Sequence, residues 1–192
     1  MALTRTTKLE AVNTMLATIG ESPVNSLTGQ LGVDVRLAQS TLDEVLKAVQ
    51  SRGYHFNVEH DVDLAKDVNG YIYVANNVVE VDVYPASYPN IDPVLIGNRL
   101  YDRKEHTYVF SSDLKASLTY LREFDDVPEA VKRYVTIRAG RVFQARYPGD
   151  RVADAYSERD EMEAKGAFDQ FVSDTGDLNI FDSYLPAATI TR

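Results

Sequence analysis

Three carboxylates stand close together in the stretch LREFDDVPE, at Asp125, Asp126 and Glu129. A pair of carboxylates can hydrolyse a glycosidic bond when the two groups lie about 5–9 Å apart across the substrate. Neighbours in sequence rarely hold that separation. Acidic residues beside a first-turn proline, here Pro128, also suit the positive N-terminal end of a helix. We therefore expect these carboxylates to cap a helix, and keep glycan hydrolysis as the alternative.

The three histidines, His55, His60 and His106, are weaker candidates for chemistry. His55 and His60 are an odd number of residues apart, so in a strand they face opposite sides and cannot share a metal ion. The chain has no cysteine, no Gly-x-Ser-x-Gly elbow and no His-Glu-x-x-His motif. A Ser/His/Asp triad assembled in space would leave no such motif, so that alternative stays open. We expect structural or surface histidines, no metal site and no cofactor.

Charge is unevenly distributed in the last third of the chain. Residues 130–149 contain five basic residues and no acid, whereas residues 150–165 contain six acids and three bases. Such segments can pair between subunits or within one chain, and both alternatives stay open. The candidates for pairing between subunits are Arg133, Arg138 and Arg141 with Glu158, Glu161 and Glu163. The basic segment from Lys132 to Arg146 is also a weak candidate for nucleic-acid binding, because phosphate binding needs clustered bases and the net charge is −9.

The elements that would position these residues begin with helices. The stretch TKLE at residues 7–10 matches a capping box, and apolar residues then recur at helical spacing to Ile19. A heptad-like apolar stripe predicts a second helix that Gly53 ends. A third helix follows the acidic cluster, and Asp150 is a candidate cap for a fourth. The expected ranges are 7–19, 33–51, 129–147 and 150–172.

Between residues 54 and 124 the pattern changes to strands and turns. The stretch VEVDV at residues 79–83 alternates apolar and acidic residues, which is typical of a strand with one wet face. Asn69-Gly70 is a strong hairpin cue. Short strands are expected at residues 71–75, 79–83, 94–96, 99–101, 107–110 and 116–121.

The stretch QSRGYHFN at residues 50–57 joins the two textures. Gly53 ends the second helix. Tyr54 and Phe56, two apart in an extended chain, would point the same way and anchor the first strand to the helices. His55 would then face solvent or a neighbouring subunit. We expect this stretch to be architectural.

These patterns predict an α+β fold. Residues 1–53 and 125–176 would form an antiparallel helical bundle of about four helices, residues 54–124 a β-rich insertion, and residues 177–192 an extended C-terminal tail. The N-terminus lacks the apolar region of a signal peptide, and no apolar run approaches the roughly 20 residues of a membrane span. We therefore expect a soluble protein made in the cytoplasm, with no membrane association.

Several stretches carry a more specific signal. They are AVNTMLATIGESPVNSLTG (11–29), QSRGYHFNVE (50–59), LYDR (100–103), LREFDDVPE (121–129) and the closing ITR. In content, order and chain length they resemble the tail tubular protein A family of short-tailed, T-odd-type bacteriophages. The first two stretches are the most specific, and residues 65–97 contain no matching motif. The family usually has tryptophan where this chain has Tyr54.

This resemblance implies a structural virion protein without catalysis. The family acts as the head–tail adaptor, a twelve-subunit ring that docks on the portal protein, connects it to the tail nozzle (tail tubular protein B) and leaves a channel for DNA ejection. The C-terminal tail would bind the portal, and the β-rich part would meet the nozzle. The portal-binding residues would be Tyr184, Leu185, Ile190 and Arg192. The protein would be made in the host cytoplasm and reside at the head–tail junction of the virion.

The residues are compatible with these expectations. A ring needs a heterologous interface, which oppositely charged helices can supply. A strongly acidic assembly repels phosphate, so DNA would pass without specific binding. The alternative from another class is a tail-associated hydrolase of capsule or exopolysaccharide, as a second activity of the same tail protein, acting through Asp125, Asp126 or Glu129. A DNA-binding module is the third hypothesis.

Overall fold

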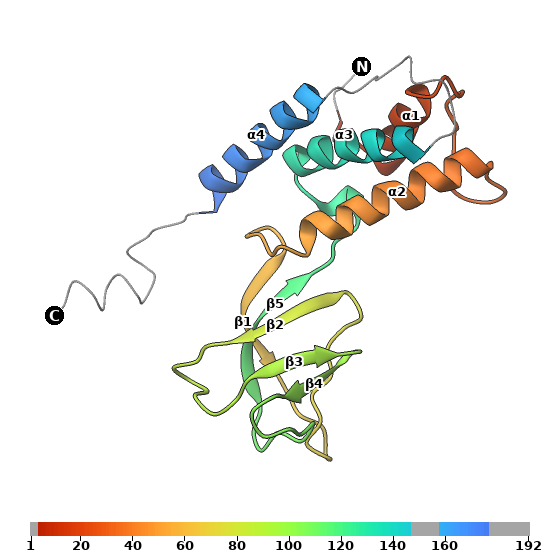
Figure 1. The fold of residues 1–192 in the computed structure, drawn as a ribbon. Coiled ribbons are helices and arrows are strands. Elements are labelled where there is room, and N and C mark those ends of the chain that lie inside the picture. The colour runs from red at the N-terminus through yellow and green to blue at the C-terminus, as the bar shows by residue number, and fades with distance from the viewer. Residues whose placement is uncertain (1–3, 147–157, 177–192) are drawn as a thin grey trace.

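In space, the helices gather at one end of the described structure and the strands at the other (Figure 1). The computed structural model describes residues 4–146 and 158–176. Its helices are α1 (Lys8–Ala17), α2 (Val33–Gln50), α3 (Glu129–Arg146) and α4 (Glu158–Thr175), with a 3-10 turn at Phe124–Asp126. Its strands are β1 (Val58–Leu64), β2 (Val78–Val83), β3 (Pro93–Ile96), β4 (Arg99–Asp102) and β5 (Leu114–Tyr120). The predicted α+β class is confirmed.

Local signals set the ends of the first two helices. The Thr7 hydroxyl accepts a hydrogen bond from the Glu10 backbone N–H at 3.2 Å, and the Glu10 carboxylate accepts one from the Thr7 N–H at 2.8 Å. This is the predicted capping box. After α2, Gly53 adopts a left-handed backbone conformation (φ +68°), which glycine adopts without steric cost. The predicted cap of α4, Asp150, lies outside the described residues.

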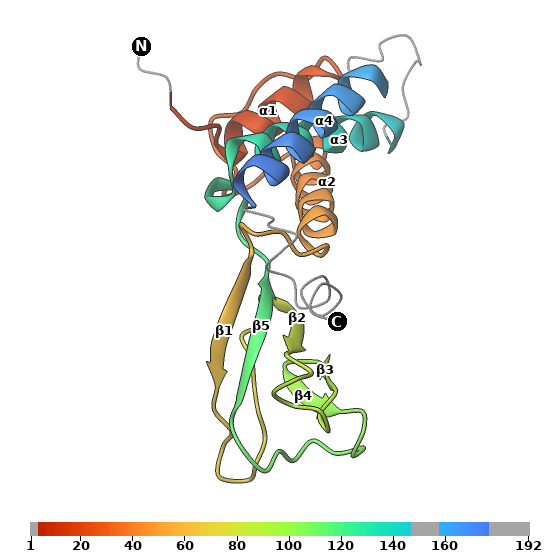
Figure 2. The ribbon, with the colours of Figure 1, turned by 90° about the vertical axis from the view of Figure 1, so that its left-hand side faces the viewer.

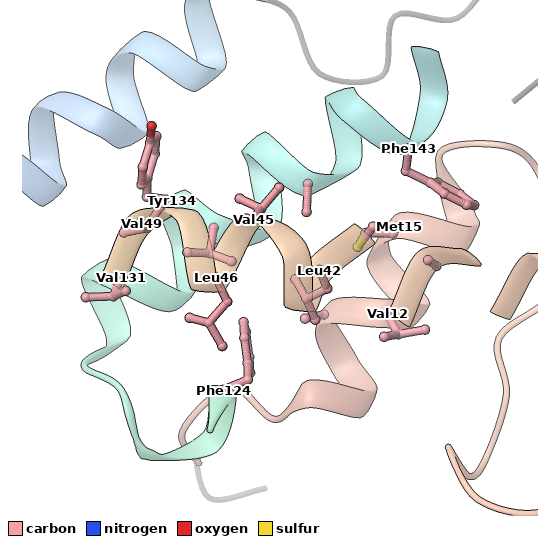
Figure 3. Packing of buried hydrophobic residues seen from close by; sticks show 14 of the residues in the cluster. Val12, Met15, Leu42, Val45, Leu46, Val49, Phe124, Val131, Tyr134 and Phe143 are labelled. Carbon is pink, nitrogen blue, oxygen red and sulfur yellow. The ribbon is translucent and has the colours of Figure 1, made fainter. Parts of the chain in front are cut away.

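The helices share one hydrophobic cluster, in which α3 contacts α1, α2 and α4. Figure 3 shows side chains of α1, α2 and α3, together with Phe124, filling the space between these elements. Leu42 is fully buried and Phe168 of α4 is 1 % exposed. Burying each such large apolar side chain contributes about 1.5–3 kcal/mol. None of the helices in the described ranges has the length and apolar character needed to cross a membrane.

The strands form two small antiparallel sheets. One has the order β1-β5-β2, and the other is the hairpin β3-β4. Figure 2 shows β1 and β5 running side by side away from the helices. Two predicted strands, 71–75 and 107–110, form only the isolated bridges Tyr73↔Arg99 and Asp102↔Thr107, so those predictions were too generous. The sequence pattern gave no range for β1, because its acidic residues are poor strand formers.

The inner faces of both sheets cover a second hydrophobic cluster. It includes Val81 and Val83 of β2, Leu100 of β4 and Leu114 of β5. The predicted alternation in β2 is confirmed from residue 80 onward, but Val79 is exposed and Val78 is buried instead. A bulge between Val78 and Glu80 explains this shift, since one extra residue moves the side chains to the other face. The helical and β clusters have no buried residue in common.

Candidate functional site

The stretch at residues 54–57, where helix gives way to sheet, is a tight turn. The N–H groups of Asn57 and Val58 both donate to the Tyr54 carbonyl at 2.9 Å. The expectation of an extended chain at Tyr54–Phe56 was therefore wrong. The two rings nevertheless stack, with centroids 5.5 Å apart and planes 9° from parallel, and both pack against the helical cluster. The turn itself brings them together.

Two buried amides hold the junction of helices and sheet. Asn57 donates to the carbonyls of Gln50 (2.9 Å) and Tyr120 (2.8 Å), and its side-chain oxygen accepts from the Tyr54 N–H at 2.8 Å. Gln50 exchanges two hydrogen bonds with the backbone of Arg122, at 2.9 and 2.8 Å. Both side chains are fully buried. Buried polar groups destabilise the fold unless they are hydrogen-bonded. This hydrogen-bonded network therefore fixes the two points where the chain passes between the helices and the sheet.

Arg122 extends the junction to the surface. Its Nε donates to the Phe56 carbonyl at 2.9 Å, and its Nη2 pairs with the Glu59 carboxylate at 3.0 Å. Burial raises the pKa of the neighbouring Tyr120 hydroxyl; the Glu59 charge raises it further, whereas the Arg122 charge lowers it. Arg122 thus binds groups of its own chain, the Phe56 carbonyl and the Glu59 carboxylate, so the junction has an architectural role.

The histidines occupy separate places in the described structure. His55 lies 2.9 Å from the Thr175 hydroxyl through Nε2, and its ring contacts Phe171, also on α4. His55 is exposed, which agrees with the expectation that it faces solvent. Its contact with α4 of the same chain was not predicted. His60 pairs instead with Ser117 on β5, at 2.9 Å. Among the described residues, no group of three His, Asp or Glu side chains is placed to hold a metal ion.

The acidic cluster before α3 binds the start of a different helix. Asp125 accepts a hydrogen bond from the Lys8 backbone N–H, the first residue of α1, at 2.8 Å. Glu129 accepts from the backbone and the hydroxyl of Thr6. The cluster was expected to cap its own helix, and Glu129 does lie in the first turn of α3. Asp125 and Glu129 also satisfy donors at the start of α1. Asp125 and Glu129 thus have a structural task, and nothing in their geometry favours the hydrolase alternative.

The charged residues of α3 and α4 meet within the chain. Arg133 pairs with Glu163 at 3.5 Å, Arg138 pairs with Glu161 at 3.3 Å, and Arg141 also contacts Glu161. These are intrachain pairs, the second of the two alternatives. Glu158 lies exposed at the first residue of α4. Pairing between subunits stays a prediction.

Lys132 departs from the expected basic face. It is 1 % exposed, its Nζ donates to the Thr6 carbonyl at 2.8 Å, and it lies 5.8 Å from the centre of the Phe124 ring. Lys132 follows Val131 and precedes Val135 by three residues, so it lies on the buried stripe of the helix. The basic segment therefore offers DNA one fewer exposed basic side chain than its sequence indicates, which weakens the DNA-binding hypothesis.

A cluster of tyrosines around one arginine was not predicted. The Arg99 guanidinium lies 3.8 Å from the centre of the Tyr108 ring and 4.9 Å from that of Tyr71. Tyr101 packs on Tyr108 with ring centroids 4.8 Å apart. The only available signal was composition, twelve tyrosines in 192 residues. The predicted portal-binding residues Tyr184, Leu185, Ile190 and Arg192 lie outside the described residues.

Comparison with known proteins identifies the family. The model of the tail tubular protein family (Tube) matches residues 9–178. Tail tubular protein A of Klebsiella phage KP34 is 33 % identical to this chain over 129 residues, which cover 67 % of this chain and 66 % of that protein. The match thus spans just under two thirds of the relative's length. The chain belongs to the tail tubular protein family, and it is a structural protein of a bacteriophage tail.

Proposed function

We propose that this protein is the head–tail adaptor of its virion. Twelve copies would form a ring that docks on the portal protein, connects it to the nozzle protein and leaves a channel for DNA. One observation carries this proposal: two separate hydrophobic clusters are joined by a fully hydrogen-bonded junction around Asn57 and Gln50. An adaptor must hold two different partners at a fixed separation, and a rigid junction between two cores does so.

The division of labour follows the chain. Residues 1–53 and 125–176 would be one unit, a helical bundle, and residues 54–124 an inserted unit that meets the nozzle. Residues 177–192, including Tyr184, Leu185, Ile190 and Arg192, would bind the portal. Family membership and the separate clusters support this division.

The charge of the chain supports a conduit that does not bind its cargo. Each copy has a net charge of −9, and twelve copies around a channel would repel phosphate. DNA would therefore pass without specific contacts. Synthesis in the host cytoplasm and residence at the head–tail junction complete the proposal.

The α3–α4 charges would also act between subunits, through their most exposed members. Arg133 and Glu163 are 61 % and 70 % exposed, so they can exchange partners when copies meet. Arg133→Glu should then weaken ring assembly, and adding Glu163→Arg to the same chain should restore it. Equal assembly of all three proteins would limit these residues to intrachain pairing.

Mixing the purified chain with the portal protein of the same phage tests the adaptor role. Electron microscopy and native mass spectrometry should find a twelve-subunit ring on the portal ring. A chain that stays monomeric and ignores the portal would contradict the proposal. A truncation that lacks residues 182–192 should keep the circular dichroism spectrum and lose portal affinity, and unchanged affinity would reject the tail assignment.

A further inference from the structure

The outer face of the small sheet is aromatic and apolar. The register of β3 and β4 pairs Val94 with Tyr101 and Ile96 with Arg99, and Tyr73 bridges to Arg99 from the other side. Cross-strand partners share a face, so these side chains lie together. We name this surface the tyrosine–arginine face, and it comprises Tyr71, Tyr73, Val94, Ile96, Arg99, Tyr101 and Tyr108. The opposite face of the same strands carries residues such as Leu100, fully buried in the β cluster.

Solvent reaches this face although its side chains are large. Tyr73 is 50 % exposed and Ile96 is 49 % exposed. Exposed apolar surface of this kind marks interaction sites, and tyrosine and arginine are enriched where binding energy concentrates at protein interfaces. The ring contacts fix the side chains before any partner arrives, which lowers the entropy lost on binding.

Arg99 is held in a form that suits a carboxylate. Tyr71 and Tyr108 contact its guanidinium, which leaves planar N–H donors for bidentate binding. Within residues 4–146 and 158–176, no carboxylate forms an ion pair with Arg99, in contrast to the nearby pair of Arg103 and Asp92 at 2.8 Å. The face therefore offers one preorganised positive charge among aromatic rings.

A complementary surface lies along β2. Glu80 and Asp82 are exposed, and the described residues provide neither with a basic ion-pair partner. Beside them a groove of about 310 Å³ runs between β2 and β3, lined also by Val79, Asp92 and Arg103. We name it the β2 groove. Its three carboxylates outnumber its one arginine, so it is an acidic hollow with apolar walls.

We propose that the tyrosine–arginine face of one copy docks on the β2 groove of the next copy. Arg99 would bind Glu80 and Asp82, while Tyr73 and Ile96 would cover the apolar wall. The face and the groove adjoin along β3, where Val94 belongs to both. Arg99 lies on the face, whereas Glu80 and Asp82 line the groove, so the contact joins unlike surfaces of two copies, is heterologous and can propagate around a ring. This inference rests on the proposed ring and names the surfaces that build it.

A second copy fits better than a nucleic acid. Proteins that bind single-stranded nucleic acid often stack its bases on tyrosine rings. Such sites also need a groove lined by several Lys or Arg side chains, which contact the phosphates. The tyrosine–arginine face contains a single basic residue, Arg99, in a chain of net charge −9. The acidic groove, in contrast, is present on every copy.

Charge reversal tests the contact. Arg99→Glu alone, and Glu80→Lys with Asp82→Lys, should each raise at least tenfold the protein concentration needed to form rings on the portal. All three substitutions in one chain restore opposite charges at every contact, and should recover most of the assembly. Arg36→Glu, an exposed site on α2, is the charge-matched control and should assemble like wild type. Circular dichroism and thermal melting check that each variant folds.

The outcomes separate this inference from the adaptor role. If the wild type forms rings on the portal and Arg99→Glu forms them equally well, or if Arg36→Glu is impaired as much as Arg99→Glu, the inference is overturned and the adaptor stands. Salt-sensitive binding of a single-stranded oligonucleotide that Arg99→Glu abolishes, with assembly unchanged, would also overturn it.

Disulfide cross-linking tests the contact without the portal. The chain has no cysteine, so Ile96→Cys and Val79→Cys in one chain introduce the only thiols. In concentrated solution under oxidising conditions they should give a ladder of linked chains, and each single variant should give dimers at most. If such a ladder forms but the wild type does not bind the portal, this inference stands and the adaptor role is rejected. No ladder would overturn the inference.

Discussion

The helical region and the β region use their surface charges in different ways. Basic residues of α3 meet carboxylates of neighbouring helices, as in the pairs of Arg146 with Glu44 at 2.7 Å and Arg138 with Glu161 at 3.3 Å. In the β region, Arg99 lies between tyrosine rings, and Glu80 and Asp82 face solvent beside the β2 groove. The first region pairs many of its charges within the chain. The second pairs some, such as Arg103 with Asp92, but presents Arg99, Glu80 and Asp82 outward.

The difference teaches what each surface is for. Exposed ion pairs contribute only about 0–1 kcal/mol each, so those between α3 and its neighbours align helices whose stability comes from the hydrophobic cluster. Charges fixed in place without an internal partner contribute little to folding. They become useful when another molecule arrives, and this is why the β region carries the proposed contact between copies.

The largest expected effect tests whether the two regions are separate cores. Phe168 on α4 stacks on Tyr134 at 5.4 Å and meets Tyr54 edge-on at 5.1 Å. Phe168→Ala should lower the free energy of unfolding by about 3–5 kcal/mol, measured by urea denaturation, because a large cavity forms. Hydrogen exchange should accelerate in the helices and stay slow in β5. The control is Leu100→Ala in the β cluster, which should show the reverse pattern; equal acceleration in both regions would mean one cooperative unit.

A junction variant should break the connection between the regions. Asn57→Ala leaves two carbonyls and one N–H without their side-chain partner, which should cost about 3 kcal/mol. Asn77 is a matched control, since it is exposed and its amide makes one long contact to the Leu121 carbonyl at 3.3 Å. Asn77→Ala should cost less than about 0.5 kcal/mol. Similar losses for both variants would show that the network does not hold the junction.

The helices were readable from the sequence because their signals are local. The capping box at Thr7 and the apolar stripe of α2 act within a few residues, and the structure reproduces both. The end of α2 was likewise correct, since Gly53 supplies a left-handed conformation that other residues avoid.

The junction and the tyrosine–arginine face could not be read in the same way. Asn57 binds the Tyr120 carbonyl 63 residues away, and Gln50 binds Arg122 72 residues away. Nothing in the local pattern distinguishes these amides from surface residues. The tyrosines likewise come from three separate segments, and only the register of β3, β4 and the Tyr73 bridge brings them to one face.

A pair of glycine substitutions sharpens the description of the junction. At Gly53, with φ +68°, an added Cβ would also lie 3.4 Å from the side chains of Val58 and Thr119. Gly53→Ala should therefore cost about 1–2 kcal/mol. Gly166 in the middle of α4 has open space around it, and Gly166→Ala should stabilise by up to about 1 kcal/mol. Thermal melts that move in the same direction for both would contradict the strained conformation at Gly53.

The smallest expected effect concerns the pairing of charges in the helical region. A hydrogen bond from Arg146, and then its positive charge, lower the pKa of Glu44 below its ordinary value of 4.5. Since the folded pKa is the lower one, the pair stabilises the protein above pH 4.5, and this contribution is lost as the pH falls through the folded value. Arg146→Gln should bring the Glu44 pKa, measured by NMR titration, back toward 4.5 and flatten the acid limb of stability slightly. Lys47→Gln, on the same helix, removes the same charge without that hydrogen bond and should leave the Glu44 pKa lowered. If the wild-type Glu44 pKa is itself ordinary, the pair does not form in solution, and the contrast between an internally paired helical surface and an outward-facing β surface loses its clearest example.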